Sequence, residues 1–382
     1  MNYIGSKYSL IENILSLITE HVPIQGSALD LFSGTSTVTQ ALKSLGFTTY
    51  ANDWQYYSFV TAHSYLHFNE YPLFEKLLKH TEMLSCYQEQ FPEGSHQITI
   101  HSLQKRGRSS ESQNAFTILW FLEQLPGTTG SFFHQYAEGG EQGRLYFSKK
   151  NGQKIQAIGD QISIWNEQGF LSKAELYWLR ASLVESADRI ANTASVYGAF
   201  LKKVKKSAQK PLRMIALSPV SSPTPNLGHK AFCADASTLF REKQLPKMTL
   251  TYLDPPYNQR QYSGNYHILE TIARWDLDTF EPRGKTGLRN SSDQSSPFCS
   301  KRKVLDAFDR LFASIDSEYL LFSYNNEGLI SEPELQDLFA KHCSETQFFK
   351  LNYGRFRADN DGTNRKYVAD SVVEFLVLGR KK

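Results

Sequence analysis

The N-terminal part of the chain alternates between helical and strand-like patterns of hydrophobic residues. Apolar side chains recur at helical spacing and predict a helix over 8–20: Leu10, Ile11, Ile14, Leu15 and Ile18. A short apolar strand is predicted at 27–32, and a polar turn at 33–36 separates it from a helix over 38–45. A second short strand follows at 48–51. Strand, turn, helix and strand in this order open a βαβ unit, which predicts a parallel sheet.

Strand and helix patterns return in the C-terminal third of the chain. An apolar run predicts a buried strand at 250–253. Further elements are expected in this order: a helix over 302–315, a strand over 319–323, a helix over 331–342, and strands over 348–353 and 372–378. Because a polar loop joins the last two strands, we expect an antiparallel hairpin at the edge of the sheet. The predicted fold class is α/β.

The segment between these two regions has helical patches, polar runs and little alternation. It contains a basic run at Lys202–Lys206 and a stretch rich in proline and serine at 207–230, which predicts a loop. We therefore predict that residues 61–231 form a large, mainly helical insertion. Residues 1–60 and 232–382 would then form the domain that carries any catalytic site.

The composition is that of an ordinary globular protein, with 40% hydrophobic and 21% charged residues in a chain of 382. Lysine and arginine total 42 against 39 acidic residues, a balance that permits a nucleic-acid partner without requiring one. The four cysteines lack C-x-x-C spacing, so we predict no metal site and expect a reducing, cytoplasmic location. No signal peptide and no apolar run approaching the roughly 18 residues of a membrane span are recognised.

The strongest chemical signal is the tetrapeptide Asp254-Pro255-Pro256-Tyr257, directly after the strand at 250–253. In open α/β sheets, ligands bind at the carboxyl ends of the strands. The Asp254 carboxylate and the Pro255 carbonyl can accept two N–H groups from a planar amine and make its lone pair available for attack. Tyr257 can stack on a flat ring, a contact of about 1–3 kcal/mol. The alternative is a proline-rich turn in which Asp254 is a simple cap.

A second motif, Asp30-Leu31-Phe32-Ser33-Gly34-Thr35, joins the first strand to the next helix. Gly34 allows a tight turn close to a ligand, and the following helix N-terminus attracts negative charge. Asp53 follows Asp30 by 23 residues, close to the offset at which an acid meets a ribose hydroxyl in nucleotide-binding sheets. There is no G-x-G-x-x-G, which disfavours a dinucleotide. Taken alone, the segment also fits a generic strand-turn-helix.

Two weaker segments carry further candidate residues. In the N-terminal Asn2–Lys7, Tyr3 offers an aromatic platform and Lys7 a cation for a zwitterionic ligand; a frayed terminus with a solvated lysine is the alternative. In Cys233-Ala-Asp235-Ala236, Asp235 can accept from an adenine amino group, or it can cap a helix over 236–242.

Taken together and in this order, these motifs resemble the adenine-N6 DNA methyltransferases with a D-P-P-Y tetrapeptide, the D12 or Dam-like class. The resemblance covers about 1–60 and 232–380, and 258–267 also resembles the modification methylases of restriction systems. It implies a Rossmann-like, seven-stranded sheet with a reversed terminal hairpin, and S-adenosylmethionine as cofactor. At Ser36 the family usually has a second glycine, so the loop must keep a negative φ there or accept strain.

The resemblance converts the motifs into predicted roles. The predicted catalytic residues are Asp254, Pro255 and Tyr257. The predicted cofactor-binding residues are Tyr3, Lys7, Asp30, Phe32, Ser33, Gly34, Thr35, Asp53, Asp235 and Ala236. No metal is predicted.

The expected partner is double-stranded DNA, with the target adenine flipped out of the helix. The insertion at 61–231 is the predicted recognition region, and basic or polar residues are candidates for DNA contacts: Arg260, Tyr262, Asn265, Arg289, Lys301, Lys202 and Lys203. An ordinary solvated face is the alternative for each charged group.

The predicted function is methyl transfer from S-adenosylmethionine to adenine N6 at a specific DNA site, protecting host DNA beside a separately encoded restriction endonuclease. Cytosine-N4 methylation, adenine methylation in RNA, and a catalytically idle nucleic-acid-binding protein on the same fold stay open as alternatives.

Overall fold

The computed structural model describes residues 7–80, 110–224, 227–290, 295–354 and 371–382. Their contacts divide the chain into two compact units. The sheet unit contains the described parts of Tyr3–Ala62, Ser222–Asn265 and Ser291–Lys382, and the helical unit contains those of His63–Ser221 and Tyr266–Asn290. The segment Tyr266–Asn290 thus packs with the helical unit, whereas the sequence analysis assigned it to the catalytic domain.

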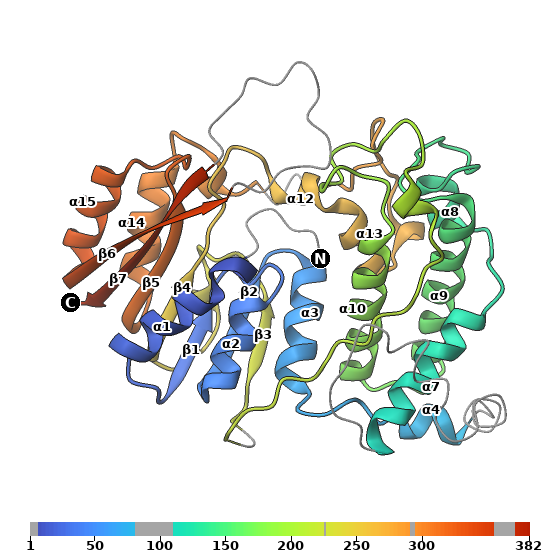
Figure 1. Cartoon of the computed structure of the whole chain (residues 1–382), viewed down its shortest axis with the longest axis horizontal. Helices are drawn as coiled ribbons and strands as arrows, with labels where there is room; N and C mark the ends of the chain where they lie inside the picture. Colours follow the sequence, from blue (N-terminus) through green and yellow to red (C-terminus); the bar gives the residue numbers. More distant parts are fainter. Residues whose placement is uncertain (1–6, 81–109, 225–226, 291–294, 355–370) are drawn as a thin grey trace. The chain divides into compact units, whose positions relative to one another are not determined.

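The sheet unit contains a seven-stranded sheet in the described chain, as expected from the family resemblance (Figure 1). Its strands are β1 (Ser27–Asp30), β2 (Thr48–Asp53), β3 (Lys230–Cys233), β4 (Met248–Leu253), β5 (Ser317–Asn325), β6 (Cys343–Gly354) and β7 (Ser371–Lys381). The order across the sheet is β3-β2-β1-β4-β5-β7-β6. Neighbours from β3 to β5 are parallel, and β7 runs antiparallel to both β5 and β6. The predicted α/β class and the reversed terminal hairpin are confirmed.

Edge strand β3 is an element that the sequence analysis missed. Its four residues, Lys-Ala-Phe-Cys, are half-buried or exposed, so they lack the apolar signature of a buried strand. Pairing with β2, for instance Asn52 beside Phe232, makes this segment a strand.

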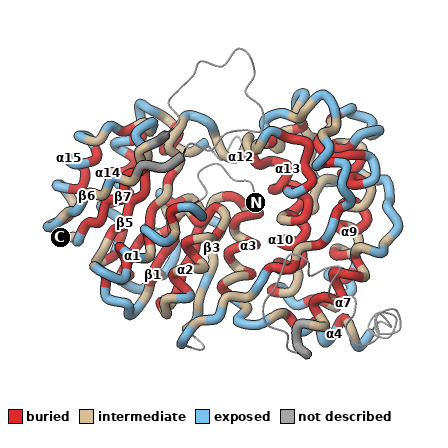
Figure 2. Tube along the Cα trace, in the orientation of Figure 1, coloured by how far each residue is buried: buried red, intermediate tan, exposed pale blue. Residues whose placement is uncertain are grey.

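Helices cover both faces of the sheet because successive strand residues point to opposite faces. On one face, α1 (Ile11–His21) and α2 (Thr37–Leu45) pack on a core that includes Leu250 and Leu321. On the other, α14 (Val304–Ser314) and α15 (Glu332–His342) pack on Leu320 and Phe322. The central strands are accordingly buried (Figure 2). Shorter elements of this unit are η1 (Lys7–Leu10), α11 (Leu239–Glu242), α12 (Tyr262–Asn265) and η5 (Pro297–Cys299).

The helical unit is built from helices that bury aromatic side chains. The chain enters this unit within α3 (Tyr56–His67). The elements that follow in the unit are α4 (Glu75–Lys79), α7 (Ser110–Gln124), α8 (Ser131–Tyr136), α9 (Lys149–Glu167), α10 (Lys173–Arg189), η3 (Lys206–Gln209), α13 (His267–Arg274) and η4 (Leu277–Thr279). Helix α10 begins with a capping box between Ser172 and Glu175.

Trp275 explains why the late segment Tyr266–Asn290 joins the helical unit. Its indole N–H donates to Asp160 Oδ1 at 3.0 Å, and the Arg180 guanidinium lies 5.3 Å from its ring centre. The ring also meets the backbone at Gly159, where a Cβ would come within 2.1 Å of it. Such a fit fixes the chain after α13 on α9 and α10. No described helix is long and apolar enough to cross a membrane.

Candidate active site

A pocket of about 980 Å³, counting space open to solvent, lies in the sheet unit at the carboxyl ends of β1, β2 and β4. Most of the predicted site residues line it: Lys7, Asp30, Phe32, Ser33, Gly34, Thr35, Asp53, Asp235, Ala236, Asp254, Tyr257 and Tyr262. Pro256 contributes to the described lining in place of the predicted Pro255. Tyr3 lies outside the described residues.

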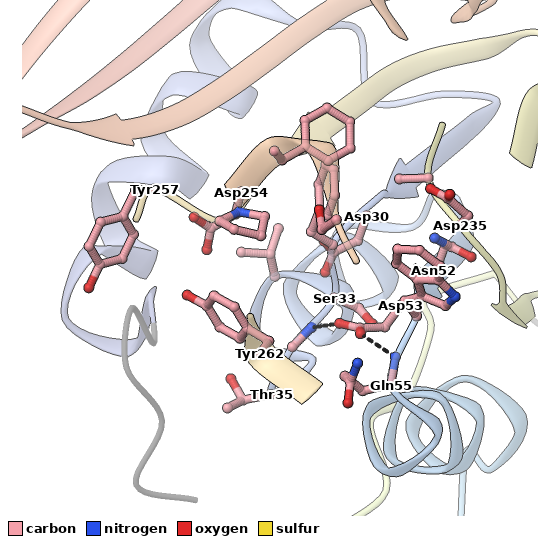
Figure 3. A pocket seen from close by; sticks show the side chains of 18 of the residues that line it. Asp30, Ser33, Thr35, Asn52, Asp53, Gln55, Asp235, Asp254, Tyr257 and Tyr262 are labelled. Carbon is pink, nitrogen blue, oxygen red and sulfur yellow. Dashed lines mark hydrogen bonds between the residues drawn. The ribbon is translucent and has the colours of Figure 1, made fainter. Parts of the chain in front are cut away.

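Strand pairing explains why two motifs far apart in the sequence share one pocket. Strands β1 and β4 are parallel neighbours, and Asp30 at the end of β1 pairs with Tyr252 near the end of β4. The turn at Gly34 and the tetrapeptide at Asp254 therefore leave the sheet at the same edge. Figure 3 shows Asp254 and Tyr257 on one side of the pocket and Asp53 and Gln55 on the other.

The turn after β1 is fixed by a carboxylate from β2. Asp53 accepts the Gly34 N–H through Oδ2 and the Gln55 N–H through Oδ1, both at 2.8 Å (Figure 3). Gly34 has a φ of 48°, a conformation that glycine adopts readily. Asp53 therefore shapes the loop in addition to lining the pocket.

Ser36 shows how the loop accommodates the residue that departs from the family pattern. Its φ is 62°, so the loop adopts the left-handed conformation and accepts strain, the second of the two expected outcomes. Its amide N–H donates to the Ser33 carbonyl at 2.6 Å, which closes the turn at the start of α2.

Asp30 is a buried carboxyl group below the loop. The Thr39 hydroxyl donates to its Oδ2 at 2.6 Å. Burial raises the pKa of Asp30 to about 7, against the effect of that hydrogen bond, and the charges of Asp254 and Asp53 raise it further. The group therefore changes charge near neutral pH.

Asn52 ties together the ends of three strands. Its amide donates to the Leu31 carbonyl at 3.2 Å after β1 and to the Ala234 carbonyl at 3.1 Å after β3. Its Oδ1 and the Ser33 hydroxyl are buried and have no partner among the described residues. Both residues line the pocket, so these atoms are available to a polar ligand. Asn52 was missed by the sequence analysis, although it stands beside the predicted Asp53.

Asp235 lies in the turn that leads into α11 and also lines the pocket. Its Oδ1 accepts the Ser237 N–H at 2.8 Å and its carbonyl accepts the N–H groups of Thr238 and Leu239, which starts α11. The turn keeps its carboxylate at the pocket edge (Figure 3).

Asp254 is held by a lysine from the start of the chain. Lys7 Nζ lies 2.9 Å from Asp254 Oδ1 and 3.1 Å from Oε1 of Glu374, which lies on β7. Burial raises the pKa of Asp254 to about 6, with Lys7 lowering it and Glu374 raising it. Lys7 thus lies at the tetrapeptide end of the pocket, beside the predicted catalytic carboxylate.

The aromatic and sulfur groups near the tetrapeptide are part of the wall. Phe298 was not predicted; it lines the pocket and packs edge-on to Phe32 with ring centres 5.5 Å apart. Burial raises the pKa of the Cys299 thiol, also in the wall, to about 11. This thiol is protonated near neutral pH and is not an activated nucleophile. Among the described residues, no His, Cys, Asp and Glu side chains form a group that could hold a metal ion.

Six of the seven predicted DNA-contact residues fall into two groups. Arg260, Lys301, Lys202 and Lys203 are exposed. Tyr262 and Asn265 belong to α12, which reaches the pocket through Tyr262.

Arg289 is engaged inside the helical unit. It makes a two-point ion pair with Asp276, with both N–O distances at 2.7 Å, and stacks over Phe280 at 4.1 Å. This contact gives its guanidinium a structural role.

Comparisons with known proteins point to one family of enzymes. The model of the D12 class N6 adenine-specific DNA methyltransferases matches residues 3–338. The chain is 37% identical to the type II methyltransferase M.NlaIII of Neisseria lactamica, with 100% of this chain and 99% of that protein aligned. It is 32% identical to modification methylase StsI of Streptococcus sanguinis and 30% identical to type II methyltransferase M.FokI of Planomicrobium okeanokoites, and spans 50% and 53% of their lengths.

Proposed function

This chain belongs to the D12 class of N6 adenine-specific DNA methyltransferases, and from that premise we propose how its pocket works. The pocket binds S-adenosylmethionine at the Gly34 end and a flipped-out adenine at the Asp254 end. One observation carries the proposal: the two motifs line a single pocket at the carboxyl ends of the neighbouring strands β1 and β4.

The residues at the Gly34 end fit this cofactor by their chemistry. Asp53 supplies a carboxylate for ribose hydroxyls, and the buried Ser33 hydroxyl and Asn52 Oδ1 supply polar atoms that have no described protein partner. The cofactor, when bound, supplies an electrophilic methyl group on a sulfonium. The protein's part is to hold it and to exclude water.

At the other end, Asp254 acts on the amine. Its Oδ1 is engaged by Lys7, and an ionised carboxylate has a second oxygen, Oδ2, with its own lone pairs. That second oxygen can accept an N6–H of adenine, which concentrates the lone pair on nitrogen and stabilises the positive charge that develops during attack. Tyr257, which also lines the pocket, stacks on the base.

DNA recognition is assigned to the helical unit and to the exposed basic residues near the pocket. An adenine in a duplex must leave the stack to enter the pocket, so other residues must read the flanking bases and bind phosphates. The exposed Lys202 and Lys203 of the helical unit and Arg260 and Lys301 of the sheet unit are candidates. Because such contacts release counterions, affinity should fall as salt rises.

A biological role follows from the relatives. Two of them are named type II methyltransferases and one a modification methylase. We propose that this protein protects DNA in a restriction-modification system, with a separately encoded endonuclease as its counterpart.

The test is transfer of a labelled methyl group from S-adenosylmethionine to matched DNA and RNA, followed by identification of the modified base. We expect N6-methyladenine in duplex DNA. Asp254→Ala should reduce transfer by a factor of about 1,000 or more while leaving cofactor affinity nearly unchanged, because the acceptor acts on the substrate amine. Asp306→Ala, an acid on the exposed face of α14, is the matched control and should behave as wild type.

Three results would contradict the proposal. Label in RNA alone, or N4-methylcytosine as the product, would identify a different substrate. DNA binding without cofactor binding would identify an idle nucleic-acid-binding protein.

A further inference from the structure

Glu374 is a buried carboxylate that the chemistry above does not use. It interrupts the apolar run Val372-Val373-Glu374-Phe375-Leu376 on β7, between β5 and β6 in the sheet. Its side chain is 3% exposed. A charge in such a position is strongly unfavourable unless it is paired and hydrogen-bonded, so its contacts explain its presence.

The contacts of Glu374 lead directly to the pocket. Its Oε1 accepts a hydrogen bond from the Ser323 hydroxyl on β5 at 2.6 Å and lies 3.1 Å from Lys7 Nζ. The same ammonium lies 2.9 Å from Asp254 Oδ1. One lysine thus joins the carboxylate in the sheet to the carboxylate in the pocket.

The charge balance of this cluster bears on the reaction. A lysine paired with Asp254 alone would neutralise the acceptor and weaken its attraction for the adenine N–H. A second carboxylate on the same ammonium restores a net negative charge to the cluster. It also fixes the position of the ammonium and hence the orientation of Asp254.

We propose that Glu374 is a positioning residue for methyl transfer: through Lys7 it orients the Asp254 carboxylate and preserves its strength as a hydrogen-bond acceptor. The proposal rests on the function proposed above for Asp254. The electrostatics of the cluster agree with it, since Lys7 lowers the pKa of Asp254 and Glu374 raises it.

The test compares Glu374→Gln with Lys7→Met by measuring kcat at saturating cofactor and DNA between pH 5 and 8.5. Glu374→Gln should lower kcat at the pH plateau by about tenfold, because small misplacements of a reacting group cost rate steeply. The acid limb of the pH profile of kcat should move to lower pH in Glu374→Gln and to higher pH in Lys7→Met. Cofactor affinity of Glu374→Gln should stay as in wild type.

Glu318→Gln is the matched control, because Glu318 on β5 pairs with Arg380 on β7 at the exposed end of the same strand pair. It should leave kcat and the acid limb unchanged. Should Glu374→Gln fail to fold by circular dichroism, Ser323→Ala removes the hydrogen bond to Glu374 and should lower kcat about threefold.

Wild-type kcat with an unmoved acid limb in folded Glu374→Gln would overturn the inference, and so would a lower kcat without a shift of that limb. If Ser323→Ala is used in place of Glu374→Gln, an unchanged kcat in that variant would also overturn the inference. An inactive wild-type protein would instead refute the proposed function itself.

Discussion

The two ends of the pocket hold their carboxylates in opposite ways. At the loop end, Asp53 accepts two backbone N–H groups from residues near it in the chain or across one strand pair. At the tetrapeptide end, Asp254 is held by the Lys7 side chain, which Glu374 holds in turn. Backbone donors are present whatever the side chain, whereas the ion-paired cluster depends on each of its members. The loop end should therefore govern cofactor affinity, and the tetrapeptide end should govern the rate and its pH dependence.

The sharpest test of this division is Asp53→Asn. Loss of the carboxylate weakens the acceptor of both N–H groups and of a ribose hydroxyl, so cofactor affinity should fall about 10- to 100-fold. The kcat at saturating cofactor should stay within about threefold of wild type. Calorimetry and initial rates measure the two quantities. A fall in kcat at unchanged affinity would erase the distinction between the two ends.

The pH dependence of kcat tests the tetrapeptide end. The pKa of Asp254 is raised to about 6, and only the ionised group accepts the adenine N–H well. We expect kcat to be flat above pH 7 and to fall about tenfold for each pH unit below the pKa. Circular dichroism at each pH checks that the protein stays folded. An acid limb below pH 4.5 would mean that Asp254 is not the titrating group.

Asp30 contrasts with both ends, because its carboxyl group titrates near neutrality and makes no ion pair with the described residues. Its pKa is 3.8 ordinarily and about 7 in the fold, so the folded state keeps a proton that the unfolded chain loses. Its favourable contribution to stability is complete below pH 3.8 and is lost as the pH rises through 7.

Asp30→Asn should consequently raise the free energy of unfolding at pH 8 by about 1 kcal/mol, after allowance for the amide's own hydrogen-bonding needs. The gain should vanish near pH 4. Urea denaturation at the two pH values measures it, and equal gains at both would show that charge is not the cause.

The smallest expected effect concerns the strained turn. Ser36→Gly removes the Cβ from a residue with a φ of 62° and should stabilise the folded state by about 0.5–1 kcal/mol. Thermal unfolding with and without cofactor is the measurement. Thr35→Gly, at a residue without positive φ, is the control and should not be stabilising. A destabilised Ser36→Gly variant would indicate that the serine side chain contributes more than strain.

Much of the sheet was predictable because buried strands and amphipathic helices have local signatures. The strands before Asp53 and Asp254 and the helix ending before Gly46 follow from apolar periodicity and turn chemistry. Strand β3 could not be predicted in this way, because a half-exposed edge strand of four residues has no run or alternation of apolar residues. Likewise, nothing local indicates that Tyr266–Asn290 packs with the helical unit.

The candidate site likewise has a part that local sequence indicates and a part that depends on contacts between distant segments. The sequence by itself determined the tetrapeptide, the Gly34 turn and the acid that follows it, since each is a short stretch whose chemistry depends on neighbouring residues. Only the tertiary structure decided that Lys7 lies beside Asp254 and that Glu374 completes the cluster. These side chains come from opposite ends of the chain and meet through the antiparallel placement of β7, and a contact between distant segments leaves no periodicity in a single sequence.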